Sequence, residues 1–381
     1  MSLHNENNFN SYPTAIIGAG CAGLSLAYKL IGSQQVPLTI LEAVKSRKEH
    51  IWAFWDDGNK DLETANALAI KSWNKWSIKT KLENVTLSGE KFKYTALSSL
   101  RFENYLKEKI KNEGFHILNG FVSKIKHHKG RKILVLKDGR EIIAKNIFDS
   151  RPPNVMKGAM YQHFVGWNIE TLLPSFDKSE AILMDFRVSQ DKGIHFIYLL
   201  PFTNRKALIE STVFSNTILP NEWYEKQIKK YLKDNYPNSE WKIINKEKGI
   251  IPLTNLENKI SMGIPIGMNA NAMRVSSGYA FAQIQKQISH LVKSLALTKK
   301  GYKINPGSSY LEQLMDKIFL DVLKNNNNKA PEIFLNMFKS LNGDEFARFM
   351  NGYSSLWVKG KIINAQEKNI FIKSALKVLF T

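Results

Sequence analysis

The sequence predicts an α/β protein of two domains, in which a parallel sheet is interrupted by an antiparallel sheet and helices follow at the C-terminus. Three observations lead to this prediction. A strand, a glycine-rich turn, a helix and a second strand succeed one another in residues 14–42, strand-like runs dominate residues 154–260, and helical periodicity dominates from Leu311 onward. At 381 residues the chain is long enough for two or three domains, or for one large domain in two parts.

The first unit, residues 14–42, is typical of a βαβ fold. Residues 14–17 are rich in β-branched side chains, residues 24–31 have a helical pattern, and residues 38–42 form a second strand. Both strands are largely apolar, so we expect them to be parallel and buried.

The turn within this unit has the spacing of a dinucleotide fingerprint. Gly18, Gly20 and Gly23 follow a strand and open a helix, and Glu42 ends the next strand. Glycines allow a tight turn and close approach of the backbone, the helix N-terminus binds a pyrophosphate, and the acidic side chain binds ribose hydroxyls. The pattern predicts a Rossmann-type domain, and Glu42 favours FAD or NAD over NADP, which carries a 2′-phosphate.

Residues 1–153 are assigned to the first part of this domain. They include an amphipathic helix in residues 97–112 and a hairpin in residues 132–143 that turns at an Asp-Gly pair. A buried strand in residues 146–150 then ends before a double proline, where we expect the chain to leave the domain.

Residues 154–260 are assigned to an inserted substrate-binding domain. Their strand-like runs predict an antiparallel sheet, which a helix in residues 222–232 covers. Residues 261–300 return to the dinucleotide-binding domain with a helix in residues 279–297. Residues 301–381 are expected to form a C-terminal helical region.

The chain is strongly basic, with a formal net charge of +20 at pH 7. This charge indicates an anionic partner, such as a phosphate-bearing cofactor, anionic lipid or nucleic acid. The lysines are dispersed as on a solvated surface, and the sequence has no zinc-finger spacing, RNP-like strand or basic region before heptads. We therefore expect no nucleic-acid function.

Cysteine and histidine usage excludes several kinds of site. Cys21 is the only cysteine, which rules out an intrachain disulfide and a cysteine-built zinc site and fits a reducing, cytosolic compartment. His163 and His195 lack metal-ligand spacing, so we expect no metal. The apolar residues 15–30 contain three glycines and Lys29, and no other run reaches the ~18–20 apolar residues of a membrane span. We expect a protein that is soluble or sits on a membrane surface.

Eight segments along the chain form an ordered series of motifs. They are HIWAFWDD (50–57), FDSRPP (148–153), YQHFVGW (161–167), ILMDFR (182–187), FIYLLPFTNRKALIEST (196–212), EKGIIP (247–252), SSGY (276–279) and FARFMNGYSSLW (346–357). In this order they resemble the lycopene cyclase family, in particular the bacterial lycopene β-cyclases, over residues 14 to about 375. The hairpin followed by FDSRP also resembles the flavin-dependent two-domain oxidoreductases, which favours FAD over NAD.

The resemblance implies a flavoprotein with reduced FAD as the active cofactor and NAD(P)H as the electron source. The implied reaction is a non-redox, acid-catalysed cyclisation of the acyclic ψ end groups of lycopene, or a related acyclic carotenoid, to β-ionone rings. Because a carotenoid lives in the bilayer, the protein would be cytoplasmic and bound peripherally to a membrane through its basic side chains. The implied cofactor-binding residues are Gly18, Gly20, Gly23, Glu42, Asp149, Arg151, Gly278 and Tyr279.

Glu210, in the segment LIEST, matches the family's glutamate and would donate the proton. Burial among Leu208, Ile209 and Val213 would favour its protonated form, whereas a solvent-facing glutamate at a strand edge is the plain alternative. Aromatic faces would stabilise the cationic intermediates, although core packing is an alternative for each ring. The candidate substrate-binding aromatic residues are Trp52, Phe54, Trp55, Phe164, Trp167 and Tyr198.

The sequence departs from the family pattern in residues 269–279. Val275 replaces a proline, Ser277 replaces a threonine, and Asn271 stands where the family has a glycine. A Gly-Asp-Ala motif near residue 265 is absent from the sequence, which argues against an ordinary hydroxylase. Two other functions stay open: a redox flavoenzyme acting on an isoprenoid, such as a geranylgeranyl reductase or an epoxidase, and a non-catalytic prenyl-lipid carrier. The ring type (β, ε or γ) also stays open.

Overall fold

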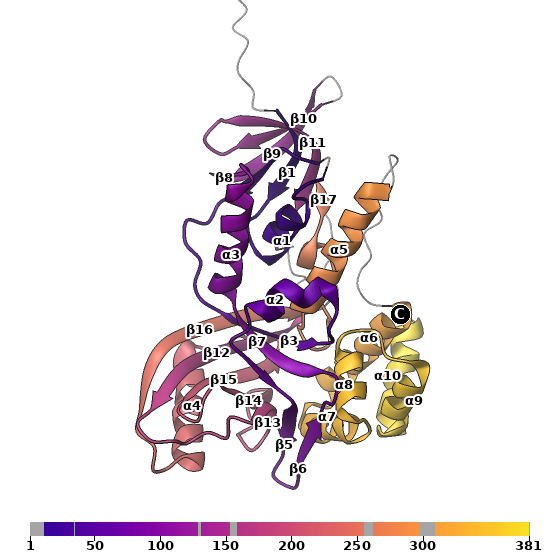
Figure 1. Ribbon diagram of the computed structural model, residues 1–381. Helices are drawn as coiled ribbons and strands as arrows, with labels where there is room; N and C mark the ends of the chain where they lie inside the picture. The colour runs from indigo at the N-terminus through magenta and orange to yellow at the C-terminus, as the bar shows by residue number, and fades with distance from the viewer. Residues whose placement is uncertain are drawn as a thin grey trace, which may run out of the picture.

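The computed structural model describes residues 11–33, 35–128, 131–152, 158–254, 262–297 and 309–380. It contains two large sheets, one above the other in Figure 1, and a group of helices beside the lower sheet. This is the α/β architecture that the sequence predicts. The expected domain boundaries, after residues 153, 260 and 300, lie outside the described residues.

The first sheet carries the predicted βαβ unit. Its strands are β1 (Ser11–Ile17), β2 (Leu38–Glu42), β8 (His116–Asn119), β9 (Val122–His128), β10 (Arg131–Leu136), β11 (Glu141–Asp149) and β17 (Ile264–Pro265). Their order is β8-β2-β1-β11-β10-β9, and β17 also pairs with β11. β1 is parallel to β2 and to β11, as expected of a dinucleotide-binding fold. The predicted hairpin turns between β10 and β11, where Gly139 has a φ of +88°.

Three helices belong to this sheet: α1 (Cys21–Lys29), α3 (Ser99–Asn112) and α5 (Phe281–Leu297). α1 packs against both α3 and α5 (Figure 1). The apolar face of α3 is buried through Phe102, Leu106 and Ile110, and the hydroxyl of Ser98 caps its start by accepting the N–H of Arg101. The amphipathic pattern in residues 97–112 is thereby confirmed.

The second sheet is larger and mostly antiparallel. Its strands are β5 (Lys75–Lys79), β6 (Asn84–Ser88), β12 (Met160–Thr171), β13 (Glu180–Asp185), β14 (Ile194–Pro201), β15 (Lys206–Ser215) and β16 (Trp241–Leu253), in the order β16-β12-β15-β14-β13-β5-β6. One face is covered by α4 (Asn221–Asn235), under which Val165, Trp167 and Ile169 of β12 are buried. Because side chains alternate along a strand, the even-numbered residues of β12 face the other way.

The structure differs from the expected division of the chain at β5 and β6. These strands come from within residues 1–153, yet β5 pairs in parallel with β13, so the second sheet is not built from residues 154–260 alone. A short sheet connects the two large ones, in the order β3 (Ile51–Asp56), β7 (Lys93–Ser98), β4 (Lys71–Trp73). Parallel pairing between distant segments leaves no local turn signal, so sequence patterns do not indicate it.

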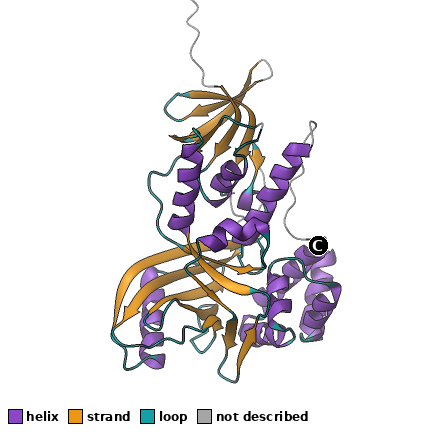
Figure 2. Ribbon diagram, in the orientation of Figure 1, coloured by secondary structure: helices purple, strands orange, loops and turns teal. Residues whose placement is uncertain are grey.

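The C-terminal region is helical, as expected, and Figure 2 shows it gathered on one side of the second sheet. It consists of α6 (Tyr310–Asn325), η3 (Asn327–Lys329), α7 (Ala330–Lys339), α8 (Gly343–Met350), α9 (Leu356–Asn364) and α10 (Lys368–Phe380). Short helical elements also lie earlier in the chain: η1 (Lys60–Leu62), α2 (Glu63–Ala67) and η2 (Gly267–Ala270). Phe334, Phe338 and Phe346 join the core on the face of the second sheet opposite α4. Within the described residues, no helix combines the length and apolar character that a membrane span needs.

Candidate active site

The glycine turn between β1 and α1 has the backbone geometry that its fingerprint requires. Gly18 has a φ of +97°, in the left-handed region that favours glycine. A Cβ on Gly23 would lie 1.9 Å from the carbonyl oxygen of Gly18, so α1 can approach the turn only because residue 23 is a glycine. Gly20 precedes α1, whose first turn carries no acidic side chain, so the N–H groups at the start of the helix favour an anion.

Glu42 lies at the end of β2 beside this turn. Its Oε2 accepts the N–H of Ala19 at 2.9 Å and the guanidinium of Arg47 at 2.5 Å. Burial alone would raise the pKa of Glu42, but the bonds from Arg47 and from backbone N–H groups hold it below its usual value, so the carboxylate is ionised. Arg47 also lies against Gly20. The residues fit a dinucleotide, since a carboxylate for ribose hydroxyls and a cation for a pyrophosphate flank the turn.

Asp149 and Arg151 flank Ser150, which supports the same turn from the neighbouring strand. The buried carboxylate of Asp149 accepts Nε and Nη2 of Arg151 at 3.0 and 2.7 Å, and Arg151 also donates to the carbonyl of Val122. Between them, Oγ of Ser150 donates to the carbonyl of Ile17 at 2.8 Å. Both predicted cofactor-binding side chains are therefore bonded to the protein itself, at the base of the glycine turn.

Residues 269–279, the segment expected to depart from the family pattern, contain a second glycine-dependent turn. Asn271 has a φ of +55°, in the left-handed region, which asparagine adopts more readily than other residues with a Cβ. It therefore supplies the backbone conformation that a glycine would supply. Gly278 has a φ of +70°, and a Cβ there would lie 3.0 Å from Oε1 of Gln162.

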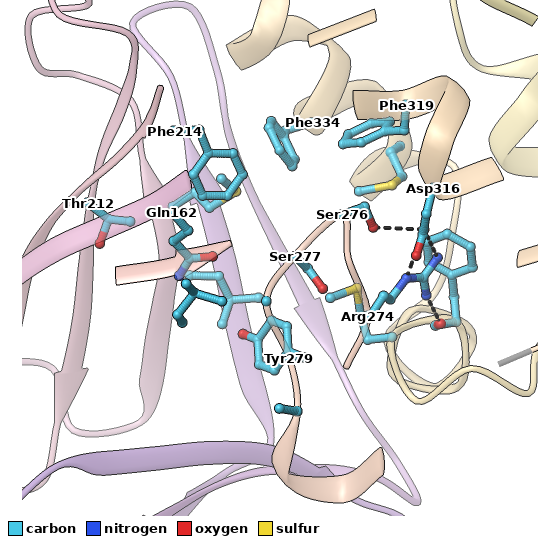
Figure 3. A pocket seen from close by; sticks show the side chains of 18 of the residues that line it. Gln162, Thr212, Phe214, Arg274, Ser276, Ser277, Tyr279, Asp316, Phe319 and Phe334 are labelled. Carbon is cyan, nitrogen blue, oxygen red and sulfur yellow. Dashed lines mark hydrogen bonds and ion pairs between the residues drawn. The ribbon is translucent and has the colours of Figure 1, made fainter. Parts of the chain in front are cut away.

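A buried ion pair fixes this segment against α6 (Figure 3). Oδ1 of Asp316 accepts Nε and Nη2 of Arg274 at 3.2 and 3.1 Å, and Oγ of Ser276 at 2.8 Å. Nη1 of Arg274 donates to the carbonyl of Phe349, and its guanidinium lies 3.9 Å from the centre of the Phe349 ring. The neighbouring Ser277 takes no part in this ion pair (Figure 3).

Two polar atoms near Gly278 are buried without a partner. Among the described residues, neither Oγ of Ser277 nor Oε1 of Gln162 finds a hydrogen-bond partner. Buried polar groups are normally paired. Both residues belong to the wall of a cavity.

This cavity has a volume of about 1040 Å³ and lies between the two sheets and the C-terminal helices. It extends from Cys21, at the start of α1, to Ile372 and Ala375 of α10, and most of its lining side chains are apolar. The predicted site residues in its wall are Trp52, Trp55, Phe164, Tyr198, Glu210, Gly278 and Tyr279. The fold thus brings the predicted acid, four predicted aromatic residues and the Gly278 turn into one space.

Two predicted substrate-binding residues, Phe54 and Trp167, lie outside the wall of this cavity. Trp167 is fully buried beneath α4, because it is three positions from Phe164 on β12 and therefore faces the opposite side of the sheet. Phe54 is buried in the core of the first domain, with its ring centre 5.0 Å from that of Phe281.

A cluster of hydrogen-bonded tyrosines forms part of the cavity wall. The hydroxyl of Tyr94 lies 2.8 Å from that of Tyr198 and 2.6 Å from that of Tyr279. The ring of Trp55 packs on Tyr94 and Tyr279, with centroids 4.6 and 5.1 Å apart. Burial raises the pKa of all three tyrosines, so they are neutral and present uncharged, electron-rich faces. The sequence motifs did not indicate Tyr94.

Glu210 is 6% exposed and lies on the cavity face of β15. Its neighbours across the sheet are Tyr198 on β14 and Gly166 on β12, and Gly166 in turn pairs with Glu247 on β16. Burial first, and then the adjacent carboxyl of Glu247, raise the pKa of Glu210 well above its usual value. These surroundings favour the protonated form of the carboxyl. Glu247 was not identified from the sequence.

The two buried histidines are engaged in hydrogen bonds. Nδ1 of His163 lies 2.6 Å from the hydroxyl of Tyr224, and Nε2 of His195 lies 2.9 Å from that of Ser211. Burial lowers the pKa of both imidazoles to about 4, so they are neutral. In the part of the chain that the structure describes, no group of three His, Cys, Asp or Glu side chains could hold a metal ion.

Sequence comparison finds relatives among cyclases. The chain matches the family model described as lycopene cyclase protein over residues 14–367. It is 26% identical over 259 residues to the lycopene beta-cyclase of Pantoea ananas, and the aligned region covers 64% of this chain and 63% of that protein. It is 25% identical over 285 residues to the lycopene beta-cyclase of Pseudescherichia vulneris, with 70% and 69% covered. The chain thus spans 63% of the length of the Pantoea protein.

The fold is similar to solved structures of flavin-dependent enzymes. A flavin-dependent brominase superposes with a TM-score of 0.64 at 14% identity, covering 93% of this chain and 98% of its own. A geranylgeranyl bacteriochlorophyll reductase-like protein from Thermoplasma acidophilum has a TM-score of 0.63 at 10% identity, with 97% and 100% covered. At these identities the likeness establishes the fold alone. Because the family model covers most of the sequence, the chain belongs to the lycopene cyclase family.

Proposed function

We propose that this chain is a lycopene β-cyclase, which converts the acyclic ψ end groups of lycopene to β-ionone rings without net oxidation or reduction. The observation that carries the proposal is the carboxyl of Glu210, buried in the wall of a long apolar cavity that reaches Cys21 after the glycine turn, where burial raises its pKa. An apolar polyene has no group for a polar site to recognise, so a dry cavity with one acid suits it.

The acid would begin the reaction by protonating the terminal double bond of an end group. The resulting tertiary cation is attacked by the neighbouring alkene, and loss of a proton from the new ring completes the isomerisation. Trp55, Tyr198 and Tyr279 line the cavity near Glu210. Each aromatic face can stabilise a nearby cation by about 0.5–2 kcal/mol, more where water is excluded.

FAD is the proposed cofactor, with NAD(P)H as the source of electrons. Gly18, Gly20 and Gly23 would hold its pyrophosphate at the start of α1, and Glu42 would hold its ribose. Reduced FAD would supply an electron-rich ring beside the reacting end group.

A membrane surface is the proposed source of the substrate, and α9 and α10 are the proposed contact. Trp357 is 73% exposed and Phe380 is 85% exposed. Ile363 and Ile372 are exposed on the same helices and also line the cavity, so an apolar surface adjoins its edge. The exposed apolar residues of these helices are Leu356, Trp357, Ile363, Ile372, Leu376, Leu379 and Phe380.

Vesicle flotation tests the membrane contact. Replacement of Trp357 and Phe380 by serine should reduce binding to vesicles that contain anionic lipid. Leu82→Ser is the matched control, because Leu82 is 98% exposed on the turn between β5 and β6. Equal loss of binding in the control, or none in the double variant, would contradict the proposed contact.

Expression in a lycopene-accumulating host tests the function. We expect γ-carotene and β-carotene from the wild type, and unchanged lycopene from Glu210→Gln with flavin content and fold retained. Glu170→Gln, a surface carboxylate on β12 paired with Lys206 and Lys242, is the control. A product with altered hydrogen content would favour a redox flavoenzyme, and a protein without flavin that leaves lycopene unchanged would favour a carrier.

A further inference from the structure

We propose that Glu247 is a second catalytic carboxyl, which shares one proton with Glu210 across Gly166 and accepts the proton that leaves the new ring. The inference rests on the proposed cyclisation and deepens it, because the cyclisation needs a proton acceptor as well as a donor. The family motifs that led to Glu210 assign no role to Glu247.

The geometry of three adjacent strands carries the inference. Gly166 on β12 lies between Glu210 on β15 and Glu247 on β16, so all three residues share one face of the sheet. A Cβ on Gly166 would lie 2.9 Å from Cγ of Glu210 and 3.1 Å from Cγ of Glu247. The two side chains therefore approach each other over the bare backbone of Gly166, close enough for each carboxyl to change the pKa of the other. Any side chain at residue 166 would enter the space that they occupy.

Both carboxyl groups face the same cavity and are withdrawn from bulk water. Glu247 is 4% exposed and Glu210 is 6% exposed, and both line the cavity wall. Two carboxylates in contact in such surroundings cannot both be ionised at low cost, so the pair retains a proton. A hydrogen bond between them would require that one be protonated, because an ionised carboxylate is an acceptor only.

The surroundings indicate where this proton lies. Oε2 of Glu247 accepts the N–H of Ile51 at 3.1 Å, which favours the ionised form of Glu247. Burial raises the pKa of both residues, and the neighbouring Glu247 raises that of Glu210 further. The proton therefore lies mainly on Glu210. The other titratable groups that face the pair or line the same wall are Tyr94, Tyr198, Tyr279, Glu49, His50 and Lys248.

The protons of the cyclisation balance within this pair. The O–H bond of Glu210 breaks as a C–H bond forms at the terminal alkene, and the ring then closes by carbon–carbon bond formation. A ring C–H bond next to the cation breaks, its electrons form the ring double bond, and the proton passes to the carboxylate of Glu247. Transfer between the two carboxyl groups returns it to Glu210. One proton enters and one leaves, with no oxidant or reductant consumed.

Two substitutions test the pair in the flavin-loaded, reduced enzyme. Glu247→Gln removes the acceptor, and we expect kcat to fall by about 10²–10⁴-fold, as for loss of a general base. Gly166→Ala keeps both carboxyl groups but separates them, and a displacement of about 1 Å should lower kcat roughly 10²-fold. Glu170→Gln, at the outer part of β12, is the matched control for loss of a carboxyl and should leave kcat unchanged.

The pH dependence separates a shared proton from a packing effect. The wild type should lose activity both at low pH, where the acceptor is protonated, and at high pH, where the donor is ionised. Glu247→Gln should lose the decline at low pH, because its single carboxyl has only one transition. A Glu247→Gln enzyme with wild-type kcat and the wild-type pH profile would overturn the proposal.

Infrared titration of the protein without substrate supplies a readout apart from activity. The carbonyl band of a buried protonated carboxyl should persist above the ordinary glutamate pKa of about 4.3. Glu210→Gln should remove it, and Glu247→Gln should shift its frequency and midpoint. A band that Glu247→Gln leaves unaltered would overturn the shared proton. If the wild type leaves lycopene unchanged but shows the band and its shift, the proposed function fails while the shared proton stands.

Discussion

Removal of the Asp316 carboxylate should destabilise the protein through the buried charge that it leaves behind. Asp316 accepts three hydrogen bonds on Oδ1, two from Arg274 and one from Ser276, and the side chains of both ion-pair partners are nearly inaccessible to water. In Asp316→Ala, Arg274 keeps only its bond to the carbonyl of Phe349 and its contact with the Phe349 ring.

The magnitude follows from these contacts. Breaking a buried ion pair by removing one partner costs about 3–5 kcal/mol, because the remaining charge is uncompensated. The orphaned hydroxyl of Ser276 is a neutral group with a smaller cost of about 1–3 kcal/mol, and local relaxation can reduce it. We therefore expect the free energy of unfolding to fall by roughly 3–5 kcal/mol in Asp316→Ala. Arg274→Met in the same chain should recover much of this loss, since the unpaired charge is then removed.

Denaturant unfolding of the four proteins of this double-mutant cycle measures the effect. Asp234→Ala is the control, because Asp234 forms an exposed ion pair with Lys230 on α4. Such a pair contributes about 0.3–0.5 kcal/mol. An Asp316→Ala variant that loses no more stability than Asp234→Ala would refute the reasoning. A variant with both Asp316→Ala and Arg274→Met that is about 3 kcal/mol less stable than Asp316→Ala alone would refute it too.

Three further substitutions test separate parts of the account. Gly23→Ala should lose bound flavin, because its Cβ would meet the carbonyl of Gly18 at 1.9 Å; normal flavin content would contradict this. Tyr94→Phe should cost about 1–3 kcal/mol in unfolding experiments, since two buried hydroxyls lose their partner; an unchanged midpoint would contradict it. The free energy of unfolding of Glu210→Gln, relative to that of the wild type, should increase as pH rises above about 4.3, by up to about 1.36 kcal/mol per pH unit. The reason is that the folded wild type keeps a proton on Glu210 that the unfolded chain releases, so only the wild type loses stability in this range. A difference independent of pH would refute it.

The parts of the fold that depend on nearby residues were predictable from the sequence. The glycine turn, the hairpin at Gly139 and the helix that begins after Ser98 are each determined by residues within a few positions of one another. The addition of β5 to the second sheet depends on pairing with β13, about a hundred residues away in the chain, and no local pattern indicates such a pair.

The candidate site was predictable where a motif coincided with one face of a strand. Glu210 and Phe164 lie on the cavity side, whereas Trp167 belongs to the same motif as Phe164 but faces α4. A motif read along the chain does not separate the two faces, although the alternation of a strand does.

Glu247 could not be identified as the partner of Glu210, because their contact depends on β12 lying between β15 and β16. The available signals were the segment EKGIIP, which begins at Glu247, and Gly166, since a glycine within a strand often marks the close approach of another group. Tyr94 was missed for a similar reason: its hydroxyl bonds to residues from two other parts of the chain, Tyr198 and Tyr279.

The most direct test of the account is the conversion of lycopene by the purified protein loaded with reduced FAD, followed by chromatography and mass measurement. We expect products with one and two β rings and the same mass as lycopene, and none with Glu210→Gln. Unchanged lycopene from a folded, flavin-loaded wild type, or a product of different mass, would contradict the account.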